Sequence, residues 1–208
     1  MSQAKDIIDD IKHRFPDRMG NIYPALNRAI RLVSKRLKYH GSSSVKGALS
    51  VSITAGASSG TLPTDFWGLL GEPYLSGETS VLKPMHDLRT KLIYSTASTP
   101  VYYEIFGSTI NLIPGSSPAA TIKGDYWQRP TKITKPTDTI PYSELWDDTI
   151  QEALIHIYTT GGSSTDANYI SMMENFIYKS IDEIIPGLER KSPTRIEDAN
   201  QYNALMWD

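Results

Sequence analysis

Over the first forty residues, apolar side chains recur at intervals of three and four positions, which is the spacing of one face of an α-helix. The first such face consists of Ile7, Ile8, Ile11 and Phe15. Ser2 is placed to cap this helix, and Pro16 to end it. A second helix is expected from Asn21 to His40, with an apolar face made of Leu26, Ala29, Ile30, Val33 and Leu37. The pattern therefore predicts two amphipathic helices before residue 41.

Between residues 41 and 140 the period changes to two. Apolar and small polar side chains alternate over Leu49–Thr54, as they do in a half-buried strand. Further strands are predicted at Val101–Phe106, Thr109–Ile113 and Thr121–Gln128. Gly107 is the first residue of a two-residue turn that suits a hairpin between two of these strands. A short helix is expected within Met85–Tyr94. We interpret the block as a small antiparallel β domain.

Helical spacing returns after residue 141 and predicts two more amphipathic helices. Ser143 is a candidate cap for the first, whose apolar face is Trp146, Ile150, Ala153, Leu154 and Ile157. The second is expected to begin near Asp166 and to bury Tyr169, Met172, Met173, Phe176, Ile177, Ile181 and Ile184. The following residues are polar for most of their length, so the chain is expected to end in an extended tail.

These patterns predict an α+β fold in which the N- and C-terminal helices form a helical bundle around an inserted β domain. Each terminal helix has a single apolar face, so the helices should pack on one another. The expected division is residues 1–40 with 141–189 as the helical body, 41–140 as the inserted β domain and 190–208 as a C-terminal arm. With 208 residues, the chain is long enough to bury a core.

Charge and composition narrow the possible functions. Twenty-one Lys and Arg residues oppose twenty-three Asp and Glu residues, and the net charge of −2 argues against coating nucleic acid through bulk charge. The chain has no cysteine, which excludes disulfides, thiolate metal sites and a cysteine nucleophile. No secretory signal and no run of about 18 apolar residues is present, so we expect a soluble chain without an export signal.

A search for catalytic motifs gives no candidate. The chain has neither a Gly-x-Ser-x-Gly nucleophile motif nor a glycine-rich phosphate loop. Glu152 and His156 lie one helical turn apart, but a metal site needs at least one more ligand, and a surface contact explains the pair more simply. We therefore expect no catalytic, cofactor or metal site.

Two other residue sets have functional interpretations beside structural ones. The second helix has cations opposite its apolar face, at Arg28, Arg31, Lys35 and Lys38, and Arg36 lies among them. This face could contact a phosphate backbone without sequence specificity, or it could be solvated or paired with acids of a neighbouring helix. The strand aromatics Tyr102, Tyr103, Tyr126 and Trp127 could form a sugar-binding platform, but a core or interface role is the favoured interpretation.

Three short motifs follow one another through the middle of the chain, at Leu62–Trp67, Pro100–Pro114 and Ile122–Pro130. In this order they resemble the motifs of the head-to-tail adaptor (connector) proteins of tailed bacteriophages. That family has a Leu-Pro-x-Asp-Phe stretch, then a Tyr…Gly…Ile-x-Leu-x-Pro hairpin and a Tyr-Tyr-x-x-Pro strand. The segment Ala25–Ala29 is similar to the same family, and the resemblance covers most of residues 20–160.

The resemblance implies a structural virion protein at the neck between head and tail, assembled in the host cytoplasm and without catalysis, cofactor or membrane contact. Such adaptors form rings, usually dodecameric, that dock on the portal protein, continue the DNA channel and present a surface to a tail (nozzle or tail-tube) protein. Double-stranded DNA would be a transient, non-specific partner, and the candidate face toward it is Arg28, Arg31, Lys35 and Lys38. The alternative is a non-specific nucleic-acid-binding module that uses this face.

The C-terminal arm combines a polar segment with an apolar end. The polar part cannot offset the entropic cost of its own ordering, so we expect it to be mobile in the free subunit. The apolar end consists of Tyr202, Leu205, Met206 and Trp207. The resemblance implies that the receptor for these four side chains is the portal, and the alternative is a disordered tail with chance apolar residues.

Overall fold

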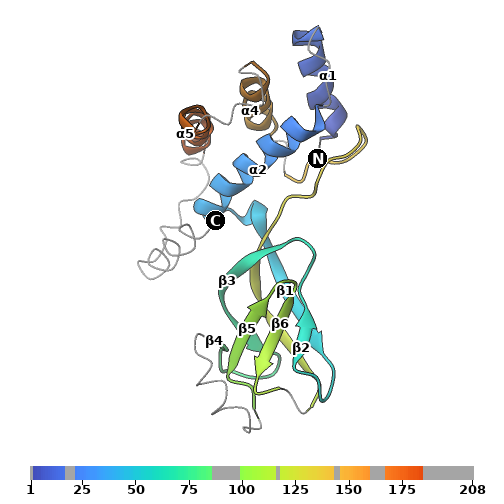
Figure 1. The fold of residues 1–208 in the computed structure, drawn as a ribbon, viewed down its shortest axis with the longest axis vertical. Coiled ribbons are helices and arrows are strands. Elements are labelled where there is room, and N and C mark those ends of the chain that lie inside the picture. Colours follow the sequence, from blue (N-terminus) through green and yellow to red (C-terminus); the bar gives the residue numbers. More distant parts are fainter. Residues whose placement is uncertain are drawn as a thin grey trace. The chain divides into compact units, whose positions relative to one another are not determined.

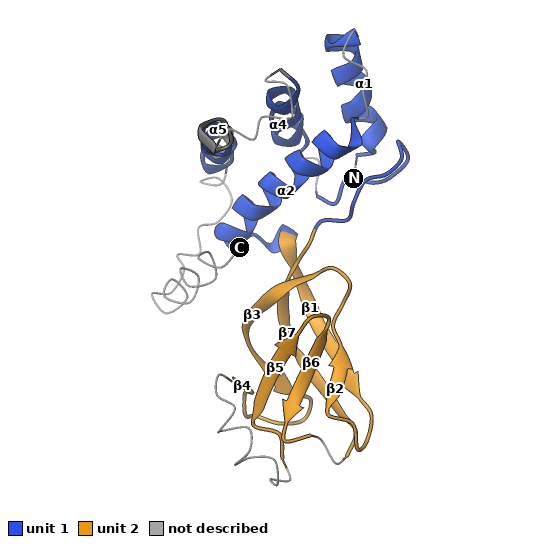
Figure 2. Ribbon diagram, viewed as in Figure 1, with its two compact units in different colours: residues 1–44, 130–208 blue, residues 45–129 orange. Residues whose placement is uncertain are grey.

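The computed structural model describes residues 2–16, 22–85, 99–115, 118–142, 146–159 and 167–184. Its class is α+β, as predicted. Its helices are α1 (Ala4–Arg14), α2 (Tyr23–Tyr39), α4 (Asp147–Thr159) and α5 (Ala167–Ile184), with a short 3₁₀ turn at Ser43–Val45 (Figure 1). Contacts divide the chain into two compact units, one of residues 1–44 with 130–208 and one of residues 45–129 (Figure 2). We call them unit 1 and unit 2.

In unit 1, α2 and α4 bury the faces that the apolar spacing predicts. The apolar face expected for α2 is buried, and so is that of α4, whose residues Trp146, Ile150, Ala153, Leu154 and Ile157 are at most 2% exposed. Helix α2 contacts α4 and α5, α4 contacts α5, and α1 contacts α4. Each amphipathic helix thus buries its apolar side against another helix, which removes that side from water.

The N-terminal cap of α1 differs from the prediction. Gln3, not Ser2, is the capping residue, and its backbone N–H donates to the carboxylate of Asp6 (3.1 Å). The hydroxyl of Ser2 instead donates to Asp147 in the first turn of α4. This contact spans 145 positions, so local spacing could not reveal it. Ser143, the candidate cap of the next helix, lies outside the described residues.

The apolar face predicted for α5 is too wide. Ile177 and Ile181 are buried as expected, whereas Met172 is 64% and Phe176 41% exposed. The two buried residues are one turn apart and form a narrow seam, because only this line of the helix is buried among the described side chains. The side chains of Tyr169, Met173 and Ile184 lie outside the described set.

Residues 130–142 belong to unit 1 by their contacts, although the β domain expected from the sequence extends to residue 140. Backbone hydrogen bonds join this segment to the start of α1, from Ala4 N–H to the Asp138 carbonyl and from Ile140 N–H to the Ser2 carbonyl (both 2.9 Å). The amide of Asn27 in α2 donates to the Ile133 carbonyl and accepts from the Ile133 N–H, both at 2.8 Å. The segment is thereby tied to both N-terminal helices.

Unit 2 consists of two small sheets. Their strands are β1 (Lys46–Ile53), β2 (Ser59–Thr61), β3 (Phe66–Leu75), β4 (Lys83–Pro84), β5 (Tyr102–Phe106), β6 (Thr109–Ile113) and β7 (Ala120–Gln128). The sheet orders are β1-β7-β3 and β2-β6-β5-β4. Pairing is antiparallel as predicted, except that β4 runs parallel to β5. The chain between these two strands is long enough to cross over instead of turning back, which a parallel pair requires.

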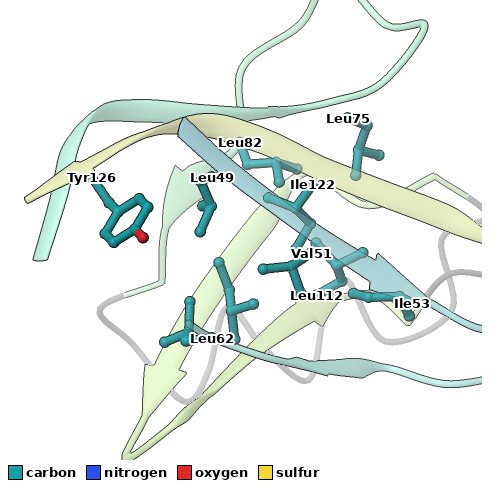
Figure 3. Close-up of a cluster of buried hydrophobic side chains, with 10 residues drawn as sticks. Leu49, Val51, Ile53, Leu62, Leu75, Leu82, Leu112, Ile122 and Tyr126 are labelled. Carbon is teal, nitrogen blue, oxygen red and sulfur yellow. The ribbon is translucent and has the colours of Figure 1, made fainter. Parts of the chain in front are cut away.

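The predicted strands and their hairpin are confirmed. Gly107 has a φ of 59° and Ser108 a negative φ, which corresponds to the glycine-first, type II′ hairpin turn. Alternate residues of β1 point inward, so that Leu49, Val51 and Ile53 join a buried cluster with Leu112 and Ile122 (Figure 3). The helix expected within Met85–Tyr94 lies, apart from Met85, outside the described residues.

Candidate functional site

The basic face of α2 is the charged surface that the sequence singled out. Arg31 and Lys35 are exposed, and Arg28 and Lys38 are half-buried. Arg31 and Lys35 form no ion pair or hydrogen bond with any residue that the structure describes, while Arg28 and Lys38 have further contacts. At about 100° per residue, the four cations lie opposite the buried face of the helix. The helix therefore presents two available cations, one turn apart.

The other sides of α2 are covered within unit 1. Its apolar face contacts α4 and α5. On a third side, α2 is covered by residues 130–142. The hydroxyl of the fully buried Ser34 forms a hydrogen bond with the phenol of Tyr142, and the Asn27 amide donates to the Ile133 carbonyl. Within the helix, the Ser34 hydroxyl also donates to the Ile30 carbonyl (2.6 Å). Burial raises the pKa of the Tyr142 hydroxyl to about 12. Within the described part of unit 1, the basic face is thus the side of α2 that remains open to a partner.

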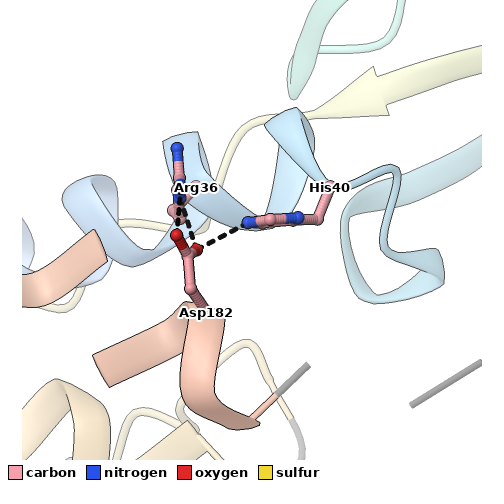
Figure 4. A network of polar contacts seen from close by, with 3 residues as sticks. All are labelled: Arg36, His40 and Asp182. Atoms are coloured by element: carbon pink, nitrogen blue, oxygen red, sulfur yellow. Dashed lines mark hydrogen bonds and ion pairs between the residues drawn. The ribbon is translucent and has the colours of Figure 1, made fainter. Parts of the chain in front are cut away.

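Arg36 lies apart from this face. Its guanidinium donates to the Asp182 carboxylate of α5 through Nε (2.8 Å) and Nη2, and His40 Nε2 lies 2.7 Å from the same carboxylate (Figure 4). The guanidinium also lies over the rings of Tyr39 (4.6 Å) and Tyr178 (4.9 Å). The bond from Arg36 is the main cause that lowers the pKa of the Asp182 carboxyl, and the bond from His40 acts in the same direction. Arg36 therefore joins two helices and is not available to an external ligand.

Helix α4 has an acidic outer face. Asp148 and Glu152 are exposed, and neither forms an ion pair with a described residue. The ring of His156, one turn beyond Glu152, packs on Phe176 of α5 with its centroid 4.1 Å away. Within the described residues, no group of three or more His, Asp and Glu side chains could hold a metal ion. The Glu152 and His156 pair is therefore a surface feature of the helix.

The motif residue Asp65 connects two of the three motifs. Its carboxylate accepts hydrogen bonds from the Tyr126 hydroxyl (2.9 Å) and from the Gln128 amide (3.0 Å), and its carbonyl accepts from the Arg129 N–H (2.6 Å). Phe66 stacks on Tyr126 with ring centroids 5.7 Å apart. Burial raises the pKa of the Tyr126 hydroxyl, and the Asp65 charge adds to this effect. These residues join the start of β3 to the end of β7, so this part of the motif pattern has a structural role.

The strand aromatics Tyr103, Tyr126 and Trp127 are buried or pack against the core of unit 2, as the favoured interpretation predicts. Tyr126 and Trp127 are each 5% exposed, and Tyr103 packs against the buried cluster of unit 2. The Lys46 ammonium lies 5.4 Å from the Trp127 ring centroid. Among the described aromatic side chains, Phe106 at the hairpin is the most exposed, at 78%. A flat sugar-binding platform would require several exposed rings on one face, which Tyr126 and Trp127 do not provide.

The apolar end of the arm, Tyr202, Leu205, Met206 and Trp207, lies outside the described residues. No helix within the described ranges is both long and apolar enough to cross a membrane.

The hydrogen bonds of Asp65 and Asp182 could not be predicted from the apolar spacing. The side-chain partners of each carboxylate lie more than sixty positions away along the chain.

Comparison with known protein families gives one match of nearly full length. Residues 2–196 match the family described as SU10 adaptor protein. The matched range contains all three motifs, the whole of unit 2, most of unit 1 and the basic face of α2, and it does not include Tyr202. No curated protein matches the chain.

Proposed function

We propose, on the premise that the chain belongs to the SU10 adaptor protein family, that it joins the portal of a phage capsid to the tail as one subunit of a ring. As a phage adaptor it is a structural component of the virion. The family match over residues 2–196 is the observation that carries the proposal. The ring would be dodecameric, would continue the DNA channel of the portal and would assemble in the host cytoplasm.

The two-unit organisation supports this role. Each unit has its own buried cluster, so each can present a surface without depending on the other for its stability. A ring subunit between two different proteins needs separate surfaces for the portal, for the tail protein and for its neighbours. Arg36 with Asp182, and Asp65, form their hydrogen bonds inside their own units, where they join elements of the fold.

We propose that the C-terminal arm binds the portal. Burying Leu205, Met206 and Trp207 could each contribute on the order of 1.5–3 kcal/mol before ordering costs. Repetition around a ring turns modest anchors into a strong attachment through effective concentration. Truncation after Glu197 should leave the melting temperature nearly unchanged but prevent attachment to DNA-filled heads. Normal attachment of the truncated protein would show that the arm is dispensable.

Native mass spectrometry of the chain with and without its portal tests the main proposal. We expect a monomer or weak oligomer alone and a closed ring on the portal, because few large apolar side chains are exposed among the described residues. A tight oligomer of the isolated chain at nanomolar concentration would contradict the assembly order. Failure to bind the portal of the same phage would contradict the adaptor role itself.

The alternative function is non-specific binding of nucleic acid by the basic face of α2, with the DNA channel as its place in the ring. The exposure of Arg31 and Lys35 is the observation in its favour. This function requires that the isolated chain bind duplex DNA with an affinity that falls steeply with salt. Replacement of Arg28, Arg31, Lys35 and Lys38 by Ser should then abolish binding of a labelled duplex.

A further inference from the structure

We propose that the exposed basic face of α2 binds the acidic outer face of α4 in a second copy of this chain. The contact pairs Arg31 and Lys35 of one copy with Asp148 and Glu152 of the next. The inference rests on the ring of the proposed function and supplies that ring with a subunit contact. It also gives the basic face an occupant other than DNA.

The basic side of the contact is preorganised and unsatisfied. Arg31 and Lys35 are exposed on a helix whose remaining sides are fixed by α4, α5 and residues 130–142. Their charges have no partner among the described residues. The backbone positions of the two cations are four residues apart, which is a rise of about 6 Å along the helix axis.

The acidic side matches this geometry. Asp148 and Glu152 are also four positions apart, so they too are separated by about 6 Å along their helix. Both are exposed and unpaired within the described residues, and they lie opposite the face that α4 buries. Two helices laid side by side can therefore form two ion pairs, whether they run parallel or antiparallel.

The same copy cannot form these pairs. Helices α2 and α4 contact each other through their buried sides, so the two charged faces point away from each other. A contact between different faces of two copies is heterologous, and such a contact closes into a ring when the rotation between copies divides a full turn. The placement of complementary faces on opposite sides of one rigid unit is what a ring subunit requires.

DNA fits the basic face less well than a neighbouring copy does. A single chain offers two exposed, unpaired cations, whereas proteins with strong electrostatic affinity for DNA make about 6–10 phosphate contacts, so the isolated chain should bind duplex DNA weakly. The net charge of −2 also gives the chain no overall attraction to the phosphate backbone. Charge complementarity therefore favours the second copy.

Disulfide trapping tests the contact directly, because the chain has no cysteine of its own. Copies with Lys35→Cys would be mixed with mass-tagged copies carrying either Asp148→Cys or Glu152→Cys, one for each helix orientation, at low salt and oxidised, in the presence and absence of the portal. We expect the mixed dimer to exceed either homodimer at least about fivefold, since the two positions face each other only across copies. Lys135→Cys, an exposed position of unit 1 outside the two charged helix faces, is the matched control with each α4 cysteine. A mixed dimer no more abundant than this control would overturn the proposal.

Charge reversal gives a second test. The variant R31E/K35E has two acidic faces, and the variant D148K/E152K has two basic ones. Each alone should lose ring formation on the portal by about tenfold, because like charges oppose. Their mixture should restore rings of alternating copies in native mass spectra. Circular dichroism of each variant checks folding, and folded variants whose mixture fails to assemble would overturn the pairing.

The outcomes also separate this inference from the adaptor role. A wild-type ring on the portal without the trapped dimer would overturn the α2–α4 contact and leave the adaptor role intact. Absence of any portal ring would contradict the proposed function itself. Duplex binding can be measured by fluorescence anisotropy for the wild type and for R31S/K35S. If the variant binds at least about tenfold more weakly and no dimer is trapped, the face is assigned to DNA instead.

Discussion

Asp65 in unit 2 and Asp182 in unit 1 are two carboxylates with similar geometry and different partners. Asp65 accepts from neutral donors, the Tyr126 hydroxyl (2.9 Å) and the Gln128 amide (3.0 Å). Asp182 accepts from the Arg36 guanidinium (2.8 Å) and lies 2.7 Å from the His40 ring. A carboxylate that is bound by neutral donors responds to loss of a partner but little to salt, whereas a carboxylate in an ion pair responds to loss of a partner and also to salt. The two units should therefore lose stability under different conditions.

The largest effect is expected from Asp65→Ala. It removes the acceptor for the Tyr126 hydroxyl, whose residue is 5% exposed, and for the Gln128 amide. We expect a loss of about 2–3 kcal/mol in the free energy of unfolding of unit 2, because buried donors would be left unsatisfied. Urea unfolding followed by Trp fluorescence measures it.

A double-mutant cycle with Tyr126→Phe gives the control for Asp65. Phe has no hydroxyl to leave unsatisfied, so the second substitution should cost clearly less in the Asp65→Ala background than in the wild type. Strict additivity of the two losses would contradict the bond between these side chains.

Asp182→Ala should have a smaller effect that depends on salt. The Arg36 side chain, 19% exposed, would lose its carboxylate, but the Asp182 side chain is 40% exposed and its contribution is screened by water. We expect about 1 kcal/mol at low salt. Thermal melts at low salt and at about 1 M NaCl should show the difference shrinking, since the Debye length falls to about 3 Å. Equal salt dependence for Asp65→Ala would remove the distinction between the two carboxylates.

The pH dependence sharpens the same comparison. The pKa of Asp182 is lowered in the folded protein, so its contribution is present above the unfolded value of about 3.9 and is lost as the pH falls below it. Asp182→Asn should therefore lose less stability than the wild type between about pH 5 and pH 3. Asp138, whose pKa is also lowered, chiefly by a backbone bond from Thr134, is unchanged in both proteins. Parallel acid-unfolding curves would contradict the role of Asp182.

The smallest effect is expected from Arg36→Lys. Lysine keeps the charge but loses the two-pronged bond to Asp182 and the planar stacking on Tyr39 and Tyr178. We expect a loss below about 1 kcal/mol in the free energy of unfolding. Arg31→Lys on the exposed face is the matched control and should stay within about 0.5 kcal/mol of the wild type by chemical denaturation. Equal values for the two variants would show that the Arg36 geometry contributes nothing.

Secondary structure and class could be predicted from the sequence because apolar spacing is a local property. The buried residues of α2, α4 and β1 have the periods of their elements, and Gly107 marks the hairpin turn. The width of the α5 face could not be predicted. An apolar residue such as Met172 has the same spacing whether or not another element covers it, and only the arrangement of neighbouring helices decides its exposure.

The polar contacts could be predicted less well than the apolar pattern. The partner of Arg36 could not be predicted, because Asp182 lies 146 positions away along the chain. The resemblance to phage adaptors marked the segments that contain Asp65 and Tyr126, but not the bond between them. The spacing puts the four cations on one side of α2, where Arg31 and Lys35 are exposed, and the external partner of this face stays a prediction.

The bond pair between Asn27 and Ile133 has a consequence for the order of synthesis. Its two residues are 106 positions apart, and the whole of unit 2 is translated between them. At about 5–20 residues per second, the N-terminal helices wait about 5–20 s on the ribosome before their partner segment emerges. Unit 2 is a continuous stretch that is complete at residue 129, before α4 and α5 are synthesised. The nascent chain therefore completes its β unit while α1 and α2 still expose the apolar faces that α4 and α5 later cover.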